Sequence, residues 1–442
     1  MSAERLPIGI WWELPPGAKW SNEGVSRVIG FLVEGAALRR TYAFHLVVRA
    51  GMAAEVRNDL RHLAAEEFVD WVIHEPTMAE EARYLVDAVK VAKDGEQVEN
   101  VALALYANAR VSVDGWIVPF PHFDSAAYLD KSTAVLLPDA LPYDFPLGWI
   151  EDWQAAGAWP RWRQRATKMC AQADAVINFS EHVAVKHAGP LLSIPREKIH
   201  VVPLAPPDLA PELPFVRSRT RSPRSREQAG AILREHAAER GIDYLRNFPF
   251  EECEFIVDAT HDRPTKNLGM TIDAVERIVR RDRRPLKLFL TARVNHGAHW
   301  TRLPTVIEQR QFHRDFVSLH DLPREVHAAL FHAAAITVHA SFFEGIIGCL
   351  PFYESVSVGT PCLFARGPHT SELLATEPEL TPFTFDPYDT DGLCKLIRQT
   401  IDDRNAVLKV QAQAYARLRR RTWADTADGY VKAALAGRDA RA

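Results

Sequence analysis

The segment 339–374 combines two glutamates with a glycine-containing loop and a helix start. An apolar run over 335–338 predicts a buried strand, and Glu344 follows it at the beginning of the loop. Pro351 predicts the first turn of a helix, because the missing N–H of proline costs nothing there. A strand, a glycine turn and a helix N-terminus favour a phosphate, which free backbone N–H groups and the helix dipole attract. Glu344 and Glu354, one turn into that helix, are expected to accept hydrogen bonds from hydroxyl groups of the same ligand.

Short apolar runs alternate with helical patterns along the chain. The strands and helices that they predict form the framework that holds segment 339–374 in place. The runs lie at 8–12, 45–48, 134–137, 175–178, 255–258, 287–290, 335–338 and 361–364. Their alternation with helices predicts doubly wound parallel sheets of the α/β class. A Pro-, Ser- and Arg-rich stretch over 203–227 predicts a loop between two domains, followed by a helix over about 226–246. Since such sheets bind ligands at the carboxyl ends of their strands, the sequence predicts a ligand in the cleft between the domains.

The overall composition narrows the class of protein. A length of 442 residues exceeds one ordinary core and predicts two domains. A net charge of -4 argues against a nucleic-acid partner. Five scattered cysteines without a C-x-x-C pair favour neither a disulfide framework nor zinc. With no signal sequence and no apolar run of about 18 residues, the expected location is the cytoplasm.

The glutamate segment resembles the family-4-type retaining glycosyltransferases of the GT-B fold. Their pattern S-x-x-E-G-x-G-L-P-x-x-E-x4-G-x-P is matched in order by Ser341, Glu344, Gly345, Leu350, Pro351, Glu354, Gly359 and Pro361. The family places seven residues between its glutamates and this chain places nine. Because 350–361 matches without a gap, the two extra residues are expected in the loop before the helix, among 346–349. The resemblance implies two Rossmann-like domains and donor contacts from Ser341, Gly345, Ile346, Ile347 and Gly348.

A basic turn at 261–266 extends the resemblance. The segment VDATHDRPTKNLGMTIDAV resembles the strand, turn and helix in which an arginine and a lysine clamp the donor diphosphate. Lys266 fits the lysine, His261 stands where the arginine is expected, and Arg263 follows two residues later. The resemblance implies that Lys266 and Arg263 stabilise charge on the leaving diphosphate, with His261 as a further donor contact. Glu344 would then hold sugar hydroxyls, and Glu354 the ribose.

The N-terminal half resembles the family more weakly. NEGVSRVIGFL resembles a glycine-bearing first loop and makes Gly24 a candidate for close approach to a phosphate. Asp139 and Ser180 are expected on the acceptor side of the cleft. In VLLPDALPYDFP, Pro138 precedes Asp139 where the family has a histidine.

The predicted domains follow from these matches. They are an acceptor-binding Rossmann-like domain over 1–208, a Pro- and Arg-rich linker and helix over 209–250, and a donor-binding Rossmann-like domain over 251–420. The end of the chain, 421–442, resembles the Trp-led helix that returns to the first domain in this family.

Two further charged motifs have competing interpretations. Asp389 and Asp391 imitate a metal-binding D-x-D, but their position before an apolar periodic run favours a helix N-cap, so no metal site is predicted. Five arginines over 217–226 indicate either a flexible solvated linker or a patch for an anionic membrane.

The resemblance implies transfer of a hexose, with mannose as one candidate, from a nucleotide diphosphate sugar with retention of configuration. The expected acceptor is a glycan or lipid-linked molecule in surface polysaccharide biosynthesis, with peripheral contact to the inner membrane face as one option. No cofactor and no metal are expected. The missing histidine and the longer loop leave a catalytically silent GT-B scaffold or partner-binding subunit open, and a sugar-nucleotide epimerase is the second alternative.

Overall fold

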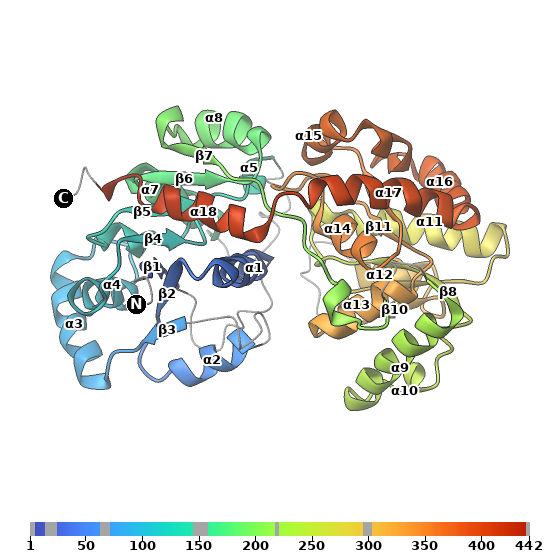
Figure 1. Cartoon of the computed structure of the whole chain (residues 1–442), viewed down its shortest axis with the longest axis horizontal. Helices are drawn as coiled ribbons and strands as arrows, with labels where there is room; N and C mark the ends of the chain where they lie inside the picture. Colours follow the sequence, from blue (N-terminus) through green and yellow to red (C-terminus); the bar gives the residue numbers. More distant parts are fainter. Residues whose placement is uncertain are drawn as a thin grey trace. The chain divides into compact units, whose positions relative to one another are not determined.

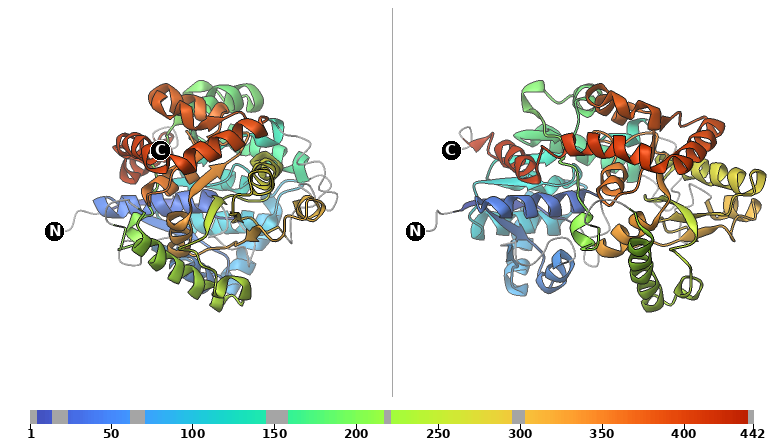
Figure 2. Two further views of the ribbon diagram at one scale, coloured as in Figure 1. Left: turned by 90° about the vertical axis from the view of Figure 1, so that its right-hand side faces the viewer. Right: turned by 45° about the vertical axis from the view of Figure 1, so that its right-hand side comes forward.

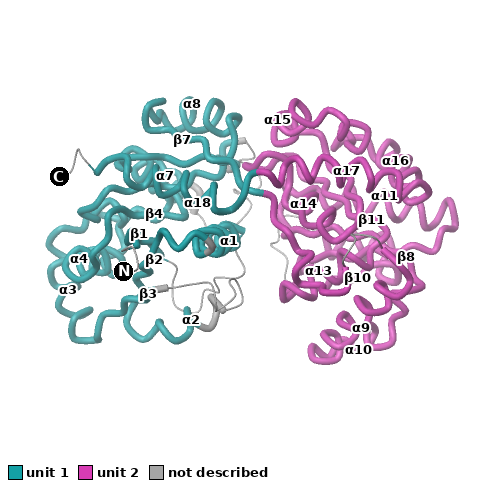
Figure 3. The backbone as a smooth tube through the Cα atoms, in the orientation of Figure 1, with its two compact units in different colours: residues 1–144, 155–205, 421–442 teal, residues 145–154, 206–420 magenta. Residues whose placement is uncertain are grey.

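Apolar runs form two parallel sheets in the computed structural model, which describes residues 5–13, 24–61, 71–144, 158–216, 221–294 and 303–438. The chain divides into two units, drawn in different colours in Figure 3. Unit 1 contains Met1–Asp144, Ala155–Ala205 and Arg421–Ala442, and unit 2 contains Phe145–Gln154 and Pro206–Arg420. Each unit holds one of the two sheets.

Unit 1 is built on a sheet in the order β3-β2-β1-β4-β5-β6-β7 (Figure 1). Its strands are β1 (Leu6–Ile10), β2 (Tyr42–Val47), β3 (Trp71–His74), β4 (Gly115–Val118), β5 (Thr133–Leu136), β6 (Ala175–Asn178) and β7 (Ile199–Val201). Its helices are α1 (Gly24–Arg39), α2 (Ala53–Arg61), α3 (Met78–Val91), α4 (Val98–Arg110), η3 (Asp124–Tyr128), α5 (Leu141–Asp144), α7 (Ala158–Gln172), η5 (Val183–Ala188), α8 (Gly189–Leu192), η6 (Arg196–Lys198) and α18 (Trp423–Ala434).

Unit 2 is built on a sheet in the order β10-β9-β8-β11-β12-β13. Its strands are β8 (Glu254–Asp258), β9 (Leu286–Leu290), β10 (Phe316–Ser318), β11 (Ile336–His339), β12 (Cys362–Ala365) and β13 (Thr384–Phe385). Its helices are η7 (Ala210–Glu212), α9 (Pro223–Glu239), α10 (Asp243–Arg246), η8 (Pro264–Lys266), α11 (Leu268–Arg281), α12 (Leu303–Gln309), α13 (Arg324–Ala333), α14 (Leu350–Ser357), α15 (Pro368–Thr376), η9 (Pro378–Phe383), α16 (Thr390–Asp402) and α17 (Arg404–Leu418).

Helices cover both faces of the unit 2 sheet, as the views in Figure 2 show. Successive side chains of a strand point to opposite faces. Accordingly, Ile256 of β8 packs in the hydrophobic cluster that includes α11 and α16, whereas Phe255 and Val257 pack in the cluster that includes α9 and α13. Burial on both faces explains why these strands read as continuous apolar runs in the sequence. The prediction of doubly wound α/β architecture is confirmed.

Segment 209–250 differs from the linker and helix expected of it. Leu209, Leu213 and Val216 are buried in the same hydrophobic cluster as Phe248 and Phe250, so the segment belongs to the core of unit 2. These apolar side chains are spaced irregularly, which is why no periodicity marks them in the sequence. The helix expected over 226–246 begins earlier, at Pro223 after the N-cap Ser222, and a second short helix, α10, follows it.

The arginine run over 217–226 is split by burial. Arg217 and Arg219 lie outside the described residues. Arg221 and Arg226 are 8% and 12% exposed in their side chains, whereas Arg224 is exposed. Two of the three described side chains are therefore turned into unit 2, so neither a solvated linker nor a membrane patch describes Arg221 and Arg226. None of the described helices combines the length and the hydropathy that a membrane crossing requires.

The last helix, α18, packs against α1 within unit 1. Trp423 stacks on Phe31 with ring centroids 5.0 Å apart. The two helices approach closely at Gly35, where an added Cβ atom would lie 2.5 Å from the Trp423 carbonyl carbon. At Gly24, the first residue of α1, an added Cβ would meet nothing within 4 Å.

We expect Gly35→Ala to destabilise unit 1 by about 1 to 3 kcal/mol, because the new methyl group forces α1 and α18 apart. Gly24→Ala is the matched control in the same helix and should leave stability unchanged or slightly raised, since alanine favours helix. Urea-unfolding midpoints followed by circular dichroism measure both. Equal midpoints for the two variants would contradict the close packing of α1 on α18.

Candidate functional site

The order of strands in unit 2 reverses between β8 and β11, which are neighbours in the sheet. Chain segments that leave the carboxyl ends of two such strands diverge to opposite faces of the sheet and leave a crevice between them. The loop after β8 carries His261, Arg263 and Lys266, and the loop after β11 carries Ser341 and Glu344. The topology therefore brings together the basic turn and the first glutamate that the sequence predicted.

A charged triplet joins these two loops. Lys266 Nζ donates to Glu344 Oε1 at 2.5 Å, and His339 Nε2 lies 2.9 Å from the same oxygen. The Lys266 side chain is 13% exposed and the Glu344 side chain 19% exposed. Lys266 is thus a partly buried lysine that is paired with a carboxylate.

Burial by itself would raise the pKa of Glu344. The charge of Lys266 and the hydrogen bond from His339 outweigh it and hold the pKa of Glu344 well below its ordinary value of 4.5. Glu344 is therefore a carboxylate at neutral pH, and its oxygens can accept hydrogen bonds from hydroxyl groups.

Asp258 ends β8 beneath this triplet and is fully buried. Thr271 Oγ1 donates to Asp258 Oδ2 at 2.7 Å, while Asp258 Oδ1 has no hydrogen-bond partner among the described residues. Burial raises the pKa of Asp258 to about 6, against the opposing effects of His339, the Thr271 hydrogen bond and Lys266. Asp258 is consequently a carboxyl group that binds a proton close to neutral pH and interacts electrostatically with His339 and Lys266.

Backbone bonds fix the two loops to each other. The amide of Phe342 donates to the Thr265 carbonyl at 2.9 Å, and Ser341 Oγ lies 3.1 Å from the same oxygen. Ser341 is fully buried, so its hydroxyl ties the loops together in this structure. His261 and Arg263 are exposed on the turn, and the Lys266 amide donates to the Arg263 carbonyl at 2.9 Å. Arg263 and Lys266 thus belong to one short turn.

The loop between the two glutamates ends where α14 begins at Leu350, with Pro351 in its first turn. Gly348 adopts φ +75°, a left-handed conformation that favours glycine, and its amide donates to the His369 carbonyl at 2.7 Å. The Tyr353 hydroxyl donates to the Ile347 carbonyl at 2.7 Å. Gly345 is buried, and Ile346 and Ile347 are half-buried. The helix is continuous from Leu350, in agreement with extra residues that lie before it.

Glu354 lies on α14 with its side chain 2% exposed, and its Oε2 is 3.6 Å from His327 Nε2 of α13. The structure thus places Glu354 against a helix, whereas Glu344 joins the Lys266 triplet. A role for Glu354 toward the ribose stays a prediction.

The three candidates in unit 1 lie at separate places. Gly24 begins α1. Asp139 follows β5, and its Oδ1 accepts from the Leu141 amide at 3.1 Å at the start of α5. Ser180 follows β6, is buried, and accepts from the Val183 amide at 3.3 Å. Asp139 and Ser180 follow the carboxyl ends of β5 and β6, and both contact the segments that follow them. A role for either residue toward an acceptor stays a prediction.

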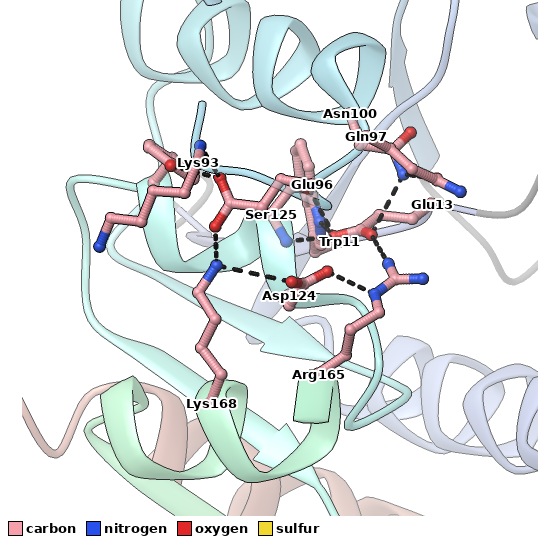
Figure 4. Close-up of polar contacts among 11 residues, drawn as sticks. Trp11, Glu13, Lys93, Glu96, Gln97, Asn100, Asp124, Ser125, Arg165 and Lys168 are labelled. Atoms are coloured by element: carbon pink, nitrogen blue, oxygen red, sulfur yellow. Dashed lines mark hydrogen bonds and ion pairs between the residues drawn. The ribbon is translucent and has the colours of Figure 1, made fainter. Parts of the chain in front are cut away.

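Figure 4 shows a second charged cluster, at the carboxyl ends of β1 and β4 in unit 1. Glu13 is buried and accepts hydrogen bonds from the Trp11 indole at 2.8 Å, the Ser125 amide at 3.0 Å and Arg165 Nη2 at 3.2 Å. Arg165 Nε also donates to Asp124 Oδ1 at 2.6 Å. Burial raises the pKa of Glu13 to about 7, opposed by the hydrogen bonds from Ser125 and Trp11. Because its oxygens are already occupied by donors, Glu13 orients Arg165 of α7 rather than offering a free carboxylate.

Asp389 is the N-cap of α16, and its side chain accepts from the Gly392 amide. Capping was the favoured interpretation of the D-x-D motif, and it is confirmed.

Solved structures match nearly the whole chain, although no family model and no curated protein matches it. HepE (Alr3699) from Anabaena, in complex with UDP and glucose, is 13% identical, with coverage of 97% of this chain and 98% of that chain and a TM-score of 0.62. Sucrose-phosphate synthase from Thermosynechococcus elongatus is 14% identical, with 96% of each chain covered and a TM-score of 0.64. A glycosyltransferase from Rickettsia africae is 11% identical, with 96% of each chain covered and a TM-score of 0.59.

The chain has the GT-B fold. This confirms the predicted fold class, whereas membership of family 4 stays a prediction.

The sequence analysis missed three residues of the GT-B sheets' charged edges. His339 and Asp258 are the last residues of β11 and β8, and Glu13 follows β1 by three residues. A polar residue at the carboxyl end of a predicted parallel strand is the signal that marks all three. Motif matching passed over them because no role was attached to Asp258 within its segment, and because His339 and Glu13 precede the matched patterns.

Asp258→Asn tests the buried carboxyl through its pH dependence. Asp258 titrates at 3.8 ordinarily and at about 6 when folded, so the folded state holds its proton more tightly. The unfolding free energy of the wild type therefore falls as the pH rises from 4 to 6. The Asp258→Asn variant lacks the titrating group, so its unfolding free energy does not fall for this reason. We expect the stability of Asp258→Asn relative to wild type to be higher at pH 8 than at pH 5 by about 1 kcal/mol or more.

Urea titrations of both proteins at pH 5 and pH 8 measure this difference. Ser318→Ala, a partly buried hydroxyl without a charge, is a control whose effect should not change with pH. A pH-independent effect of Asp258→Asn would contradict the raised pKa.

Proposed function

We propose that this GT-B protein is a glycosyltransferase that uses a nucleotide diphosphate sugar. The observation that carries the proposal is the Lys266–Glu344–His339 triplet at the strand-order reversal of unit 2. It supplies a cation for the diphosphate and an ionised carboxylate for sugar hydroxyls within one hydrogen-bonded group. HepE and its complex with UDP and glucose support the same donor chemistry for this chain.

Lys266 and Arg263 are proposed to stabilise the negative charge that develops on the leaving diphosphate, a role that fixed cations can fill without a metal ion. Lys266 pairs with Glu344 in the structure. When the diphosphate takes up the Lys266 ammonium group, Glu344 retains the hydrogen bond from His339 and accepts sugar hydroxyls. His339 thereby positions Glu344, and Asp258 lies behind both.

The finer assignments rest on the sequence resemblance. They are transfer of a hexose such as mannose with retention, a glycan or lipid-linked acceptor of surface polysaccharide biosynthesis, and a cytoplasmic location with contact to the membrane face. Donor contacts from His261, Gly345, Ile346, Ile347, Gly348 and Gly24, and acceptor contacts from Asp139 and Ser180, belong to the same proposal.

A silent GT-B scaffold is the second candidate, because Pro138 stands where the family has a histidine and the Asp139 carboxylate already accepts a hydrogen bond from the Leu141 amide. Incubation of the purified protein with UDP-, GDP- and ADP-sugars separates the two. Release of nucleoside diphosphate, by transfer or hydrolysis, supports the enzyme, and binding without release supports the scaffold.

Lys266→Ala should weaken the binding of the preferred nucleoside diphosphate by about tenfold to a hundredfold, because a charge-assisted contact to phosphate contributes about 1.5 to 3 kcal/mol. Lys287→Ala is the matched control, since Lys287 is a similarly buried lysine that pairs with Asp315 at 2.6 Å. Isothermal titration calorimetry compares the two variants. Unchanged affinity in Lys266→Ala would overturn the assignment of this site.

Glu354→Gln keeps the size of the side chain and removes its charge. If Glu354 accepts the ribose hydroxyls, nucleotide binding should weaken by about 1 to 3 kcal/mol. Glu325→Gln, at an exposed position on α13, serves as the control. Equal dissociation constants for Glu354→Gln and wild type would assign Glu354 to packing against His327 alone.

A further inference from the structure

A cavity of about 580 Å³ lies in unit 2 at the opposite end of the sheet from the triplet. It is lined by Arg221, Arg226 and Glu254, by the first turn of α9 and by the first turn of α17 with Arg404. Glu254 begins β8 and Asp258 ends it, so the two are separated by about 13 Å along a strand that rises about 3.3 Å per residue. A ligand in this cavity would be distinct from a donor held by Lys266.

The three arginines are held by hydrogen bonds to one carboxylate and to backbone carbonyl groups. Arg221 Nη2 and Arg226 Nη1 donate to the same oxygen of Glu254, at 3.0 and 3.2 Å. Arg404 Nε donates to the Ala335 carbonyl at 2.8 Å, and its Nη2 donates to the Gly359 carbonyl at 2.8 Å. Neutral carbonyl groups fix the position of Arg404 but do not neutralise its charge.

Two observations show that this positive charge is incompletely matched. Arg221 is 8% exposed, and its Nε has no hydrogen-bond partner among the described residues. Burial, followed by the charge of Arg221, lowers the pKa of Arg404 to about 9. Both groups are therefore largely removed from water, and Arg404 also experiences the positive charge of Arg221, which an anion would offset.

Four carboxylates line the cavity beside the three arginines, and two of these carboxylates pair with arginines outside the lining. Glu251 pairs with Arg234 at 2.8 Å and Asp402 pairs with Arg284 at 3.0 Å, so these two acids are already neutralised by arginines outside the cavity. Asp403 is exposed and precedes α17 without a side-chain capping bond. With those two acids paired, the three arginines of the lining outnumber its two remaining carboxylates, Glu254 and Asp403.

The helices add to this excess. The cavity is bordered by Ser222 and Pro223 at the start of the 17-residue helix α9 and by Arg404 and Asn405 at the start of the 15-residue helix α17. Both helices direct the positive ends of their dipoles toward the cavity, and such ends attract phosphate. Arginine side chains add paired N–H donors that match phosphate oxygens.

The geometry points to a second anion site, in which Arg221 and Arg404 hold the phosphomonoester group of a small metabolite, apart from the donor site. The volume exceeds what one phosphate ion needs and lies in the range of small-molecule pockets. This assignment accounts for the buried part of the arginine run and holds whether or not the protein is a glycosyltransferase.

Calorimetric titration of wild-type protein with inorganic phosphate and with glucose 6-phosphate tests the site. Arg221→Gln should weaken binding about tenfold or more, because it removes a charge-assisted contact. Arg224→Gln is the matched control, since it removes an exposed arginine only three residues along the chain, and it should stay within twofold of wild type.

Asn405→Asp covers the case in which Arg221→Gln fails to fold. An acid in the first turn suits the α17 dipole and leaves the buried arginines intact, yet it should weaken phosphate binding several-fold by repulsion. Tighter binding of glucose 6-phosphate than of phosphate would identify a phosphorylated metabolite, and equal affinities would identify free phosphate.

Three results would overturn the site. They are no binding of either compound to wild type, unchanged binding in both Arg221→Gln and Asn405→Asp, and loss of binding in Lys266→Ala. The last would place the anion at the donor site. Loss of nucleotide binding in Lys266→Ala with intact phosphate binding tests the proposed function separately.

Discussion

The pairing of Lys266 with Glu344 is the interaction on which the candidate site depends. A lysine and a glutamate that are both largely removed from water are stable only when each finds a partner. The loops after β8 and β11 bring these partners together because those strands are neighbours at the reversal of strand order. Further bonds between the same loops, from Phe342 and Ser341 to Thr265, hold the geometry. Electrostatics and backbone hydrogen bonding therefore act on the same pair of segments.

Each of the two sheets carries charged residues at the point where its strand order reverses, but the two groups of residues differ in how far their charges are already paired. In unit 1 the reversal between β1 and β4 is occupied by Glu13, whose oxygens are filled by donors from the indole, a serine and Arg165. In unit 2 the corresponding position holds a lysine and an ionised carboxylate that are partly accessible. A filled cluster stabilises its surroundings, whereas an accessible ion pair can exchange its partners for those of a ligand. Of the two clusters, the one in unit 2 is therefore better suited to bind a ligand.

Arginines occupy the other end of the unit 2 sheet. Arg226 and Arg404 bind carbonyl groups that precede β8, β11 and β12, so charge is used there to fasten strand starts. The same strands, β8 and β11, end at Asp258 and His339. The arginine cluster and the Lys266–Glu344–His339 triplet therefore lie at opposite ends of the same strands. Each can be altered by substitutions that leave the other in place.

The sequence by itself determined the doubly wound fold, most of the strand positions, the place of Pro351 in the first turn of α14 and the capping role of Asp389, because these follow from local periodicity and backbone chemistry. It also identified Lys266 and Glu344 through their order in a motif. Only the tertiary structure decided that these two residues pair, that His339 and Asp258 complete the group, and that Arg221 and Arg226 are buried while Arg224 is exposed. Those outcomes depend on which strands become neighbours and which side chains lose water, and neither quantity is encoded in the spacing of residues along the chain.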